Sequence, residues 1–270
     1  MGQIMPSWAR RMVQPMLGGP DASLQRKIYR AYRRALPASL QQGFGDPGLP
    51  RGYGKGLPER AVELLLARLS YAPGKKILDA GHANIMECHR KLLASLPEPR
   101  HLTGVDIADP VYDTAPYYER SVKADLTNTG LPGESFDLIW CISTLEHLGM
   151  DNSGYTASFA TGSHMAAHAI REMVRLANPG GQVLITVPFG KYENHEWFMN
   201  LDMDRWRSLL NIAQPTAVVA EWYFHHAGDA GWCRSDPQTL QDVGYYDEKN
   251  AGAAALAVAW LTKRRGSRIP

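Results

Sequence analysis

Four apolar stretches between Lys75 and Phe189 decide the fold: KKILDAG (75–81), HLTGVDI (101–107), FDLIWCIS (136–143) and GQVLITVPF (181–189). Each is short, almost continuously apolar and followed by turn residues, as is typical of strands that are buried on both faces. The segments 84–96 and 165–177, which lie between these stretches, are predicted to be helices. Alternating strands and helices of this kind predict an α/β fold with a doubly wound, mostly parallel sheet.

The sequence before this core is organised differently. Residues 23–36 are predicted to form a basic amphipathic helix that ends at Pro37, and a loop rich in Gly and Pro follows at 41–58. The basic side of this helix either faces solvent or binds an acidic partner. We therefore predict an N-terminal helical arm and loop over residues 1–56 and a main domain over residues 57–270.

Further elements complete the predicted main domain. They are a helix at 59–69, a short strand SVKA at 121–124, a short helix at 203–210 and a strand at 216–224. The apolar run AAALAVAWLTK (253–263) has the alanine content of a helix, but the turns before it suit a final strand. We expect a strand there.

The composition excludes several classes of protein. Hydrophobic residues make up 44% and charged residues 21% of the 270 residues, as in ordinary globular proteins. The net charge of +2 gives no signature of nucleic-acid binding. The cysteines Cys88, Cys141 and Cys233 are too few and too widely spaced for a disulfide framework, which favours a cytoplasmic location. No apolar run reaches the roughly 18 residues of a membrane span, so we expect no membrane partner.

Acidic and small residues stand where the predicted strands end. They are Asp79, Ala80, Gly81, Asp106, Ile107 and Asp125. In an open α/β sheet, ligands bind outside the carboxyl ends of the strands. Gly81 allows close approach of the backbone, and a carboxylate such as Asp106 can accept two hydrogen bonds from a ribose diol. The pattern favours a ligand that contains a nucleoside, although each residue alone also suits an ordinary turn.

Four segments resemble the successive motifs of class I S-adenosylmethionine-dependent methyltransferases. They are ILDAG, GVDI, KADLTNTGLPGESFDLIWCISTLEHLG and IREMVRLANPGGQVLITVPFG, within residues 75–190. The resemblance implies a Rossmann-like sheet of seven strands, the last antiparallel, and S-adenosylmethionine as cofactor. The residues that it assigns to the cofactor are Asp79, Ala80, Gly81, Asp106, Ile107, Asp125, Leu126, Cys141 and Ile142.

The resemblance gives these residues separate tasks. It implies that residues 79–81 line the methionine half of the cofactor, that Asp106 binds the ribose and that Asp125 lies at the adenine amino group. Upstream, Tyr53 and Lys55 belong to a loop that can fold back over the cofactor, where Lys55 would pair with its carboxylate. The alternative is that Lys55 is a solvated lysine of the loop.

The first loop departs from the pattern of the family. The usual D-x-G-x-G-x-G is replaced by DAGHANI (79–85), so that Ala83 and Ile85 occupy the positions of the second and third glycines. This leaves open a noncatalytic module that serves as a partner subunit. It also weakens a further alternative, an NAD-type oxidoreductase, which needs G-x-G-x-x-G even more directly.

The acceptor of a methyl group needs a base more than it needs a protein nucleophile. Orientation supplies much of the acceleration, but a hydroxyl or an ammonium must lose a proton. His147 is the candidate base and Asp151 the second candidate, with Tyr155 predicted to contact the acceptor; alternatively, His147 only holds its loop. We expect no metal, because His164 and His168 have no third ligand at a defined spacing.

Acidic and aromatic residues gather after the last parallel strand. The candidates for binding the acceptor are Glu193, His195, Glu196 and Trp197. Carboxylates and indole rings suit polyhydroxylated or cationic ligands. We therefore expect methylation of oxygen or nitrogen on a small molecule, with a sugar or amino sugar of a biosynthetic pathway as the narrower hypothesis. The alternative is that the tryptophans fill the C-terminal core; the oligomeric state is not determined by the sequence.

Overall fold

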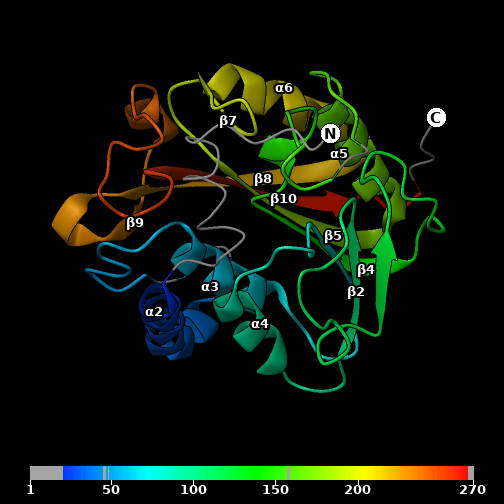
Figure 1. Cartoon of the computed structure of the whole chain (residues 1–270), viewed down its shortest axis with the longest axis horizontal. Coiled ribbons are helices and arrows are strands. Elements are labelled where there is room, and N and C mark those ends of the chain that lie inside the picture. Colours follow the sequence, from blue (N-terminus) through cyan, green and yellow to red (C-terminus); the bar gives the residue numbers. More distant parts are fainter. Residues whose placement is uncertain (1–20, 45–46, 48, 157–158, 267–270) are drawn as a thin grey trace, which may run out of the picture.

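The computed structural model describes residues 21–44, 47, 49–156 and 159–266. Its centre is a sheet of eight strands in the order β3-β2-β1-β4-β5-β10-β8-β9 (Figure 1). The strands are β1 (Lys76–Ala80), β2 (His101–Asp106), β3 (Arg120–Lys123), β4 (Phe136–Ile142), β5 (Ala177–Pro188), β8 (Ala217–His226), β9 (Trp232–Arg234) and β10 (Ala255–Lys263). Strands β1 to β5 are parallel, whereas β10, β8 and β9 join as antiparallel neighbours. The predicted α/β class is therefore confirmed.

The C-terminal run forms a strand, as expected, and lies inside the sheet rather than at its edge. Strand β10 pairs with β5 on one side and β8 on the other; its alanines are buried on the face that carries α5 and α6, and Leu256 and Val258 are buried on the other face. This packing outweighs the local preference of alanine for helix. The prediction of seven strands misses β9, whose three residues are too few to show a periodic pattern.

Helices cover both faces of the sheet. One face carries α2 (Ala22–Gln42), α3 (Arg60–Ser70) and α4 (Glu87–Ala94), and the other carries α5 (Met165–Leu176) and α6 (Met203–Ala213) (Figure 1). Neighbouring residues of β4 show this division, because Ile139 packs into the cluster of α5 whereas Trp140 packs into the cluster of α3. A two-stranded hairpin of β6 (Glu193–Asn194) and β7 (Met199–Asn200) lies between β5 and α6.

Helix α2 corrects the expectation that Pro37 ends the first helix. The helix continues to Gln42, and its buried face continues to Ser39. A proline nitrogen has no hydrogen to donate, so the carbonyl of Arg33 lacks its partner within the helix. Because Pro37 is exposed, this carbonyl can bind water instead. Helix α2 shares a hydrophobic cluster with α3 and α4. Residues 1–20, 45, 46 and 48 of the predicted arm lie outside the described residues.

Two other observations complete the fold. Helix α4 begins at Glu87, so residues 84–86 extend the preceding loop instead of forming the first turn of the predicted helix. None of the helices in the described ranges is both long enough and apolar enough to span a bilayer.

Candidate functional site

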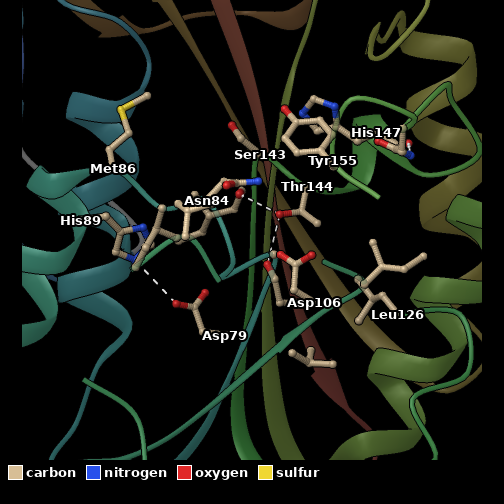
Figure 2. A pocket seen from close by; sticks show the side chains of 18 of the residues that line it. Asp79, Asn84, Met86, His89, Asp106, Leu126, Ser143, Thr144, His147 and Tyr155 are labelled. Carbon is tan, nitrogen blue, oxygen red and sulfur yellow. Dashed lines mark hydrogen bonds and ion pairs between the residues drawn. The ribbon is translucent and has the colours of Figure 1, made fainter. Parts of the chain in front are cut away.

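A cavity of about 560 Å³ lies at the carboxyl ends of β1, β2 and β4 (Figure 2). The strand order reverses between β1 and β4, which is where open α/β sheets bind ligands. The start of α2, the start of α4 and residues 147–149, 152, 155, 159 and 160 provide further walls. The described residues therefore place the cavity where the sheet topology predicts a binding site.

Gly81 allows the ends of β1 and β4 to approach each other. It adopts φ +91°, and a Cβ atom there would lie 2.1 Å from Oγ1 of Thr144. The Thr144 hydroxyl donates a hydrogen bond of 3.1 Å to the carbonyl of Ala80. Any larger residue at position 81 would push these two strand ends apart.

Side-chain contacts hold the first loop where the family pattern would use glycines. The carboxylate of Asp106 accepts hydrogen bonds of 2.9 Å from the backbone nitrogens of Ala83 and Ala108. His82 is buried beneath the loop, with Nε2 2.6 Å from Oγ of Ser121. The backbone of Ala83 and the side chain of His82 thus tie the loop to β2 and β3.

Asp79 is a buried acid on the cavity wall. The Tyr118 hydroxyl donates to Asp79 Oδ2 at 2.6 Å, and His89 Nε2 lies 3.9 Å from the same oxygen. Burial raises the pKa of Asp79 to about 7 and lowers the pKa of His89 to about 3. The imidazole is therefore neutral, and the carboxyl of Asp79 can gain or lose a proton near neutral pH.

Arg60 brings a cation to the same cavity. This first residue of α3 lies with Nη1 2.9 Å from Oε2 of Glu63, and its side chain is 14% exposed. Its Nε atom is buried and has no hydrogen-bond partner among the described residues. Nothing in the sequence singles out Arg60, because an arginine followed by a glutamate three residues later usually indicates an exposed ion pair on a helix.

One ring nitrogen of His147 makes a hydrogen bond within the protein, and the other can accept one from a ligand. Its Nδ1 donates to the carbonyl of Trp197 at 2.9 Å, since a carbonyl only accepts, and Nε2 therefore keeps its lone pair. Burial lowers the pKa of His147 to about 4. In Figure 2, Tyr155 lies close to His147 on the side of the cavity opposite His89. The arrangement suits a neutral hydrogen-bond acceptor or a weak base.

The structure brings many of the predicted site residues to this cavity. Those that line it are Asp79, Ala80, Gly81, Asp106, Ile107, Asp125, Leu126, Ile142, His147 and Tyr155. Most of them follow the ends of parallel strands, which converge at one edge of the sheet.

Three residues predicted to bind the cofactor lie elsewhere. Cys141 is fully buried in the cluster of α5, because alternate residues of β4 face opposite sides of the sheet. The hydroxyl of Tyr53 donates to the carbonyl of Ala61 and holds the loop against α3. Lys55 lies at the surface, where its ammonium is 2.6 Å from a carboxylate oxygen of Asp229.

The acidic residues after β5 do not line the cavity, which corrects the prediction that Glu193 and Glu196 bind the acceptor there. Glu193 accepts a hydrogen bond from the backbone of Tyr245 and lies 3.2 Å from His195, whose ring stacks on Phe198. Glu196 is exposed on the β6–β7 hairpin. Trp197 packs against the far side of His147, with ring centroids 4.8 Å apart. The hydrogen bond from Tyr245 and the ring stacking within the hairpin hold Glu193 and His195 away from the strand ends.

Asp151, the second candidate base, is also outside the cavity. It is exposed, and its side chain accepts a hydrogen bond from the backbone nitrogen of Ser153. Two of the tryptophans after β5, Trp206 and Trp232, are fully buried. They support the alternative in which tryptophans fill the C-terminal core.

Other residues complete the cavity without having been singled out from the sequence. They include Gln25, Arg60, Asn84, Met86, His89, Ser143 and Thr144. Ser143 ends a predicted strand and Thr144 directly follows it, so the expectation that ligands bind at strand ends could have found both residues. His89 and Gln25 belong to helices, where nothing local marks them. Within the described ranges, no group of three His, Cys, Asp or Glu side chains is arranged to hold a metal ion.

The chain is similar to one family model and, in fold, to solved structures. Residues 87–185 match the family model described as a methyltransferase domain. The comparison with curated proteins found no match.

Among solved structures, a Burkholderia thailandensis 1,6-didemethyltoxoflavin-N1-methyltransferase is 14% identical, with a TM-score of 0.50 over 98% of this chain and 93% of that chain. The N-methyltransferase NodS from Bradyrhizobium japonicum WM9, in complex with S-adenosyl-l-homocysteine, is 16% identical, with a TM-score of 0.46 over 87% and 98%. The first of these likenesses supports the fold alone. Residues 87–185 are therefore similar to a methyltransferase domain, and the strand order and the residues at the strand ends agree with the fold expected for class I methyltransferases.

Proposed function

We propose that the cavity binds S-adenosylmethionine and that the chain transfers its methyl group to oxygen or nitrogen of a small molecule. The observation that carries this proposal is the series of acids Asp79, Asp106 and Asp125, which line one cavity from the ends of successive strands. Gly81, two residues after Asp79, has no side chain and leaves the backbone there accessible. Such a series suits a ligand with an ammonium, a ribose and a purine amino group in that order.

The polar groups of the cavity fit this cofactor. Asp106 uses one lone pair on each oxygen for backbone nitrogens, and the remaining lone pairs are available to ribose hydroxyls. Asn84 Oδ1 and His89 Nε2 are buried without hydrogen-bond partners among the described residues. Leaving such groups unsatisfied costs roughly 1 to 3 kcal/mol each. A polar ligand in the cavity would satisfy them.

His147 would act on the acceptor rather than on the cofactor. When bound, S-adenosylmethionine supplies an electrophilic methyl group, so the chain has to hold the acceptor and receive its proton. The lone pair on Nε2 of His147 can accept a hydrogen bond from a hydroxyl or N–H group. The neighbouring cavity residues Leu148, Tyr155 and Phe159 would contact the body of the acceptor.

The narrower hypothesis, that the acceptor is a sugar or amino sugar, now has less support. It depended on Glu193 and Glu196, which the structure places outside the cavity. The polar groups near His147 still allow a hydroxylated acceptor, which is why we keep a sugar as one member of the panel to be tested. A role in biosynthesis and a reducing, cytoplasmic setting remain part of the proposal; the three free cysteines support the reducing setting.

Calorimetric titration of the full chain with S-adenosylmethionine, S-adenosylhomocysteine and NAD tests the proposal. We expect binding of the two sulfur ligands and none of NAD. Asp106→Asn should weaken binding of S-adenosylhomocysteine by roughly tenfold to a hundredfold, because a charged acceptor is lost. Asp113→Asn is the matched control, since Asp113 also accepts from a backbone nitrogen two residues later but lies outside the cavity.

The alternatives give different results. If neither sulfur ligand binds, the chain is a noncatalytic module. Binding of NAD alone would indicate an oxidoreductase. A panel of sugars, amino sugars, phenols and heteroaromatic amines, followed by release of S-adenosylhomocysteine, then identifies the class of acceptor.

A further inference from the structure

Glu63 is a fully buried carboxylate that three side chains contact at the cavity wall. Its Oε1 accepts hydrogen bonds of 2.6 Å from the hydroxyls of Ser143 and Thr186, and its Oε2 lies 2.9 Å from Nη1 of Arg60. These partners come from the end of β4, from β5 and from α3. One carboxylate therefore joins three elements around the cavity.

Glu63 binds Arg60 but leaves some of its N–H donors without a partner among the described residues. The guanidinium lines the cavity with Asp79 and His89, and its Nε has no hydrogen-bond partner among the described residues. Burial mainly sets the pKa values of Asp79, His89 and His147, but Arg60 lowers all three, so its charge is felt across this wall. A guanidinium has more donors than Glu63 uses and can bind a second carboxylate in the plane of its fork.

Ser143 is strained at the same point. It adopts φ +44°, which is unusual for a residue with a side chain. Its backbone nitrogen donates to Oγ1 of Thr186 at 3.0 Å while its hydroxyl donates to Glu63. Strain of this kind persists only where the surroundings fix the backbone, and it is frequent at binding sites.

From this geometry we propose that Glu63 is a positioning residue, which orients Arg60 to bind the carboxylate of an amino-acid ligand and fixes the end of β4 beside it. The inference rests on the proposed function, because the amino-acid part is that of S-adenosylmethionine. Asp79 and Arg60 lie on the same wall, and together they complement an ammonium and a carboxylate attached to one carbon. The carboxylate is thus bound by Arg60 and not by Lys55.

Two ligands that differ only in the amino-acid part distinguish this role from a general structural one. S-adenosylhomocysteine carries the carboxylate, and methylthioadenosine lacks the whole amino-acid part. Glu63→Gln keeps the shape of the side chain and its acceptor oxygen but removes the charge that holds Arg60. We expect binding of S-adenosylhomocysteine to weaken by roughly tenfold or more and binding of methylthioadenosine to change less than about twofold.

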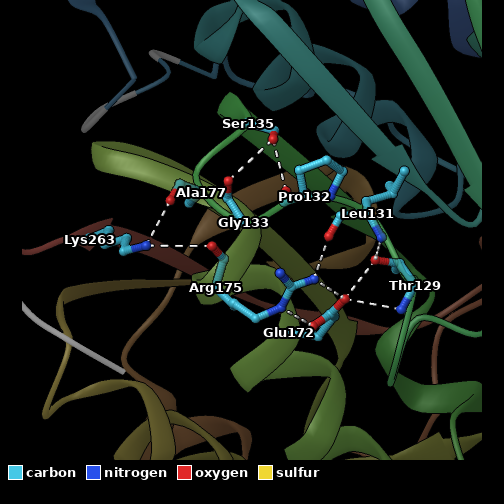
Figure 3. Close-up of polar contacts among 9 residues, drawn as sticks. All are labelled: Thr129, Leu131, Pro132, Gly133, Ser135, Glu172, Arg175, Ala177 and Lys263. Carbon is cyan, nitrogen blue, oxygen red and sulfur yellow. Dashed lines mark hydrogen bonds and ion pairs between the residues drawn. The ribbon is translucent and has the colours of Figure 1, made fainter. Parts of the chain in front are cut away.

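The matched control is Glu172→Gln. Glu172 is also buried, accepts a hydrogen bond of 2.6 Å from a threonine hydroxyl and pairs with an arginine three residues away, but it lies at the other edge of the sheet (Figure 3). This variant should bind both ligands as the parent chain does. Arg60→Lys keeps a positive charge without the fork and should also weaken binding of S-adenosylhomocysteine alone. It provides the test if Glu63→Gln does not fold.

The outcomes separate the inference from the proposed function. Equal weakening of both ligands in Glu63→Gln and Arg60→Lys would show that these residues only stabilise the cavity, and unchanged binding would show that they do not orient anything; either result overturns the inference. If the parent chain binds neither ligand, the proposed function itself fails, and the inference fails with it.

Discussion

The ring of His82 occupies the space that a side chain on Gly104 would need. A Cβ atom at position 104 would lie 2.3 Å from Cδ2 of His82. The two residues lie on the first loop and on β2, and Nε2 of the same imidazole lies 2.6 Å from Oγ of Ser121 on β3. The packing of His82 therefore requires a glycine at position 104.

This contact predicts a pair of coupled substitutions. Gly104→Ala should lower the free energy of unfolding by roughly 1 to 3 kcal/mol, because the methyl group displaces a packed ring. His82→Ala combined with Gly104→Ala should recover much of that loss, since the space becomes available. Urea denaturation of both single variants and the double variant measures the coupling. Strict additivity of the two effects would contradict the contact.

Lys263 stabilises the end of α5 from the last strand. Its ammonium, almost fully buried, donates to the carbonyl of Ala177 at 2.9 Å (Figure 3). It also lies 3.1 Å from Oε1 of Glu134. Lys263→Met should cost about 2 to 3 kcal/mol of stability, because it removes charged donors from carbonyls at a helix C-terminus. Thermal and chemical denaturation measure this loss. Lys249→Met at an exposed position is the control, and an equal effect there would refute the assignment.

The neutral state of His147 can be observed directly. Because burial lowers its pKa to about 4, the imidazole should gain its proton only as the pH falls through that value, well below the ordinary value of about 6.5. The proton NMR resonance of its Cε1–H, identified by its loss in His147→Gln, should shift with a midpoint near 4. A midpoint near 6.5 would mean that the ring is solvated.

The pKa of Asp79 predicts how stability depends on pH. Its pKa rises from 3.8 to about 7 in the folded chain, so the folded state holds a proton that the unfolded state releases between these values. The contribution of Asp79 to stability is therefore present below about pH 4 and declines as the pH rises through about 7. Asp79→Asn should remove this decline, and the variant should exceed the parent chain in stability by a few kcal/mol at about pH 8.

Urea denaturation at several pH values measures that difference. Asp113→Asn, at an exposed loop position, should follow the parent chain at every pH. Parallel curves for the parent chain and Asp79→Asn would show instead that Asp79 is ionised throughout. Binding of S-adenosylhomocysteine near pH 7 should also release a proton from Asp79, because a ligand ammonium favours the carboxylate; calorimetry in buffers of different ionisation enthalpy detects it.

The sequence by itself determined the order of strands and helices and the acids at the strand ends. Parallel strands buried on both faces have a continuous apolar pattern, and their ends converge at one edge whatever covers them. For that reason the positions of Asp79, Asp106 and Asp125 along the chain are enough to place the three acids together. The last strand, 253–263, followed from the turns before it and from the family resemblance.

Only the tertiary structure decided which residues outside the strands reach the cavity. Arg60, Gln25 and His89 belong to three different helices, and the side of each helix that faces the cavity depends on how those helices pack on one another. In contrast, Glu193 and His195 stand near a strand end in the sequence, yet the hydrogen bond from the backbone of Tyr245 to Glu193 and the stacking of His195 on Phe198 hold them away from it. A local pattern specifies which face of an element is apolar, whereas the orientation of its polar groups toward a distant element is set by contacts between segments far apart in the chain.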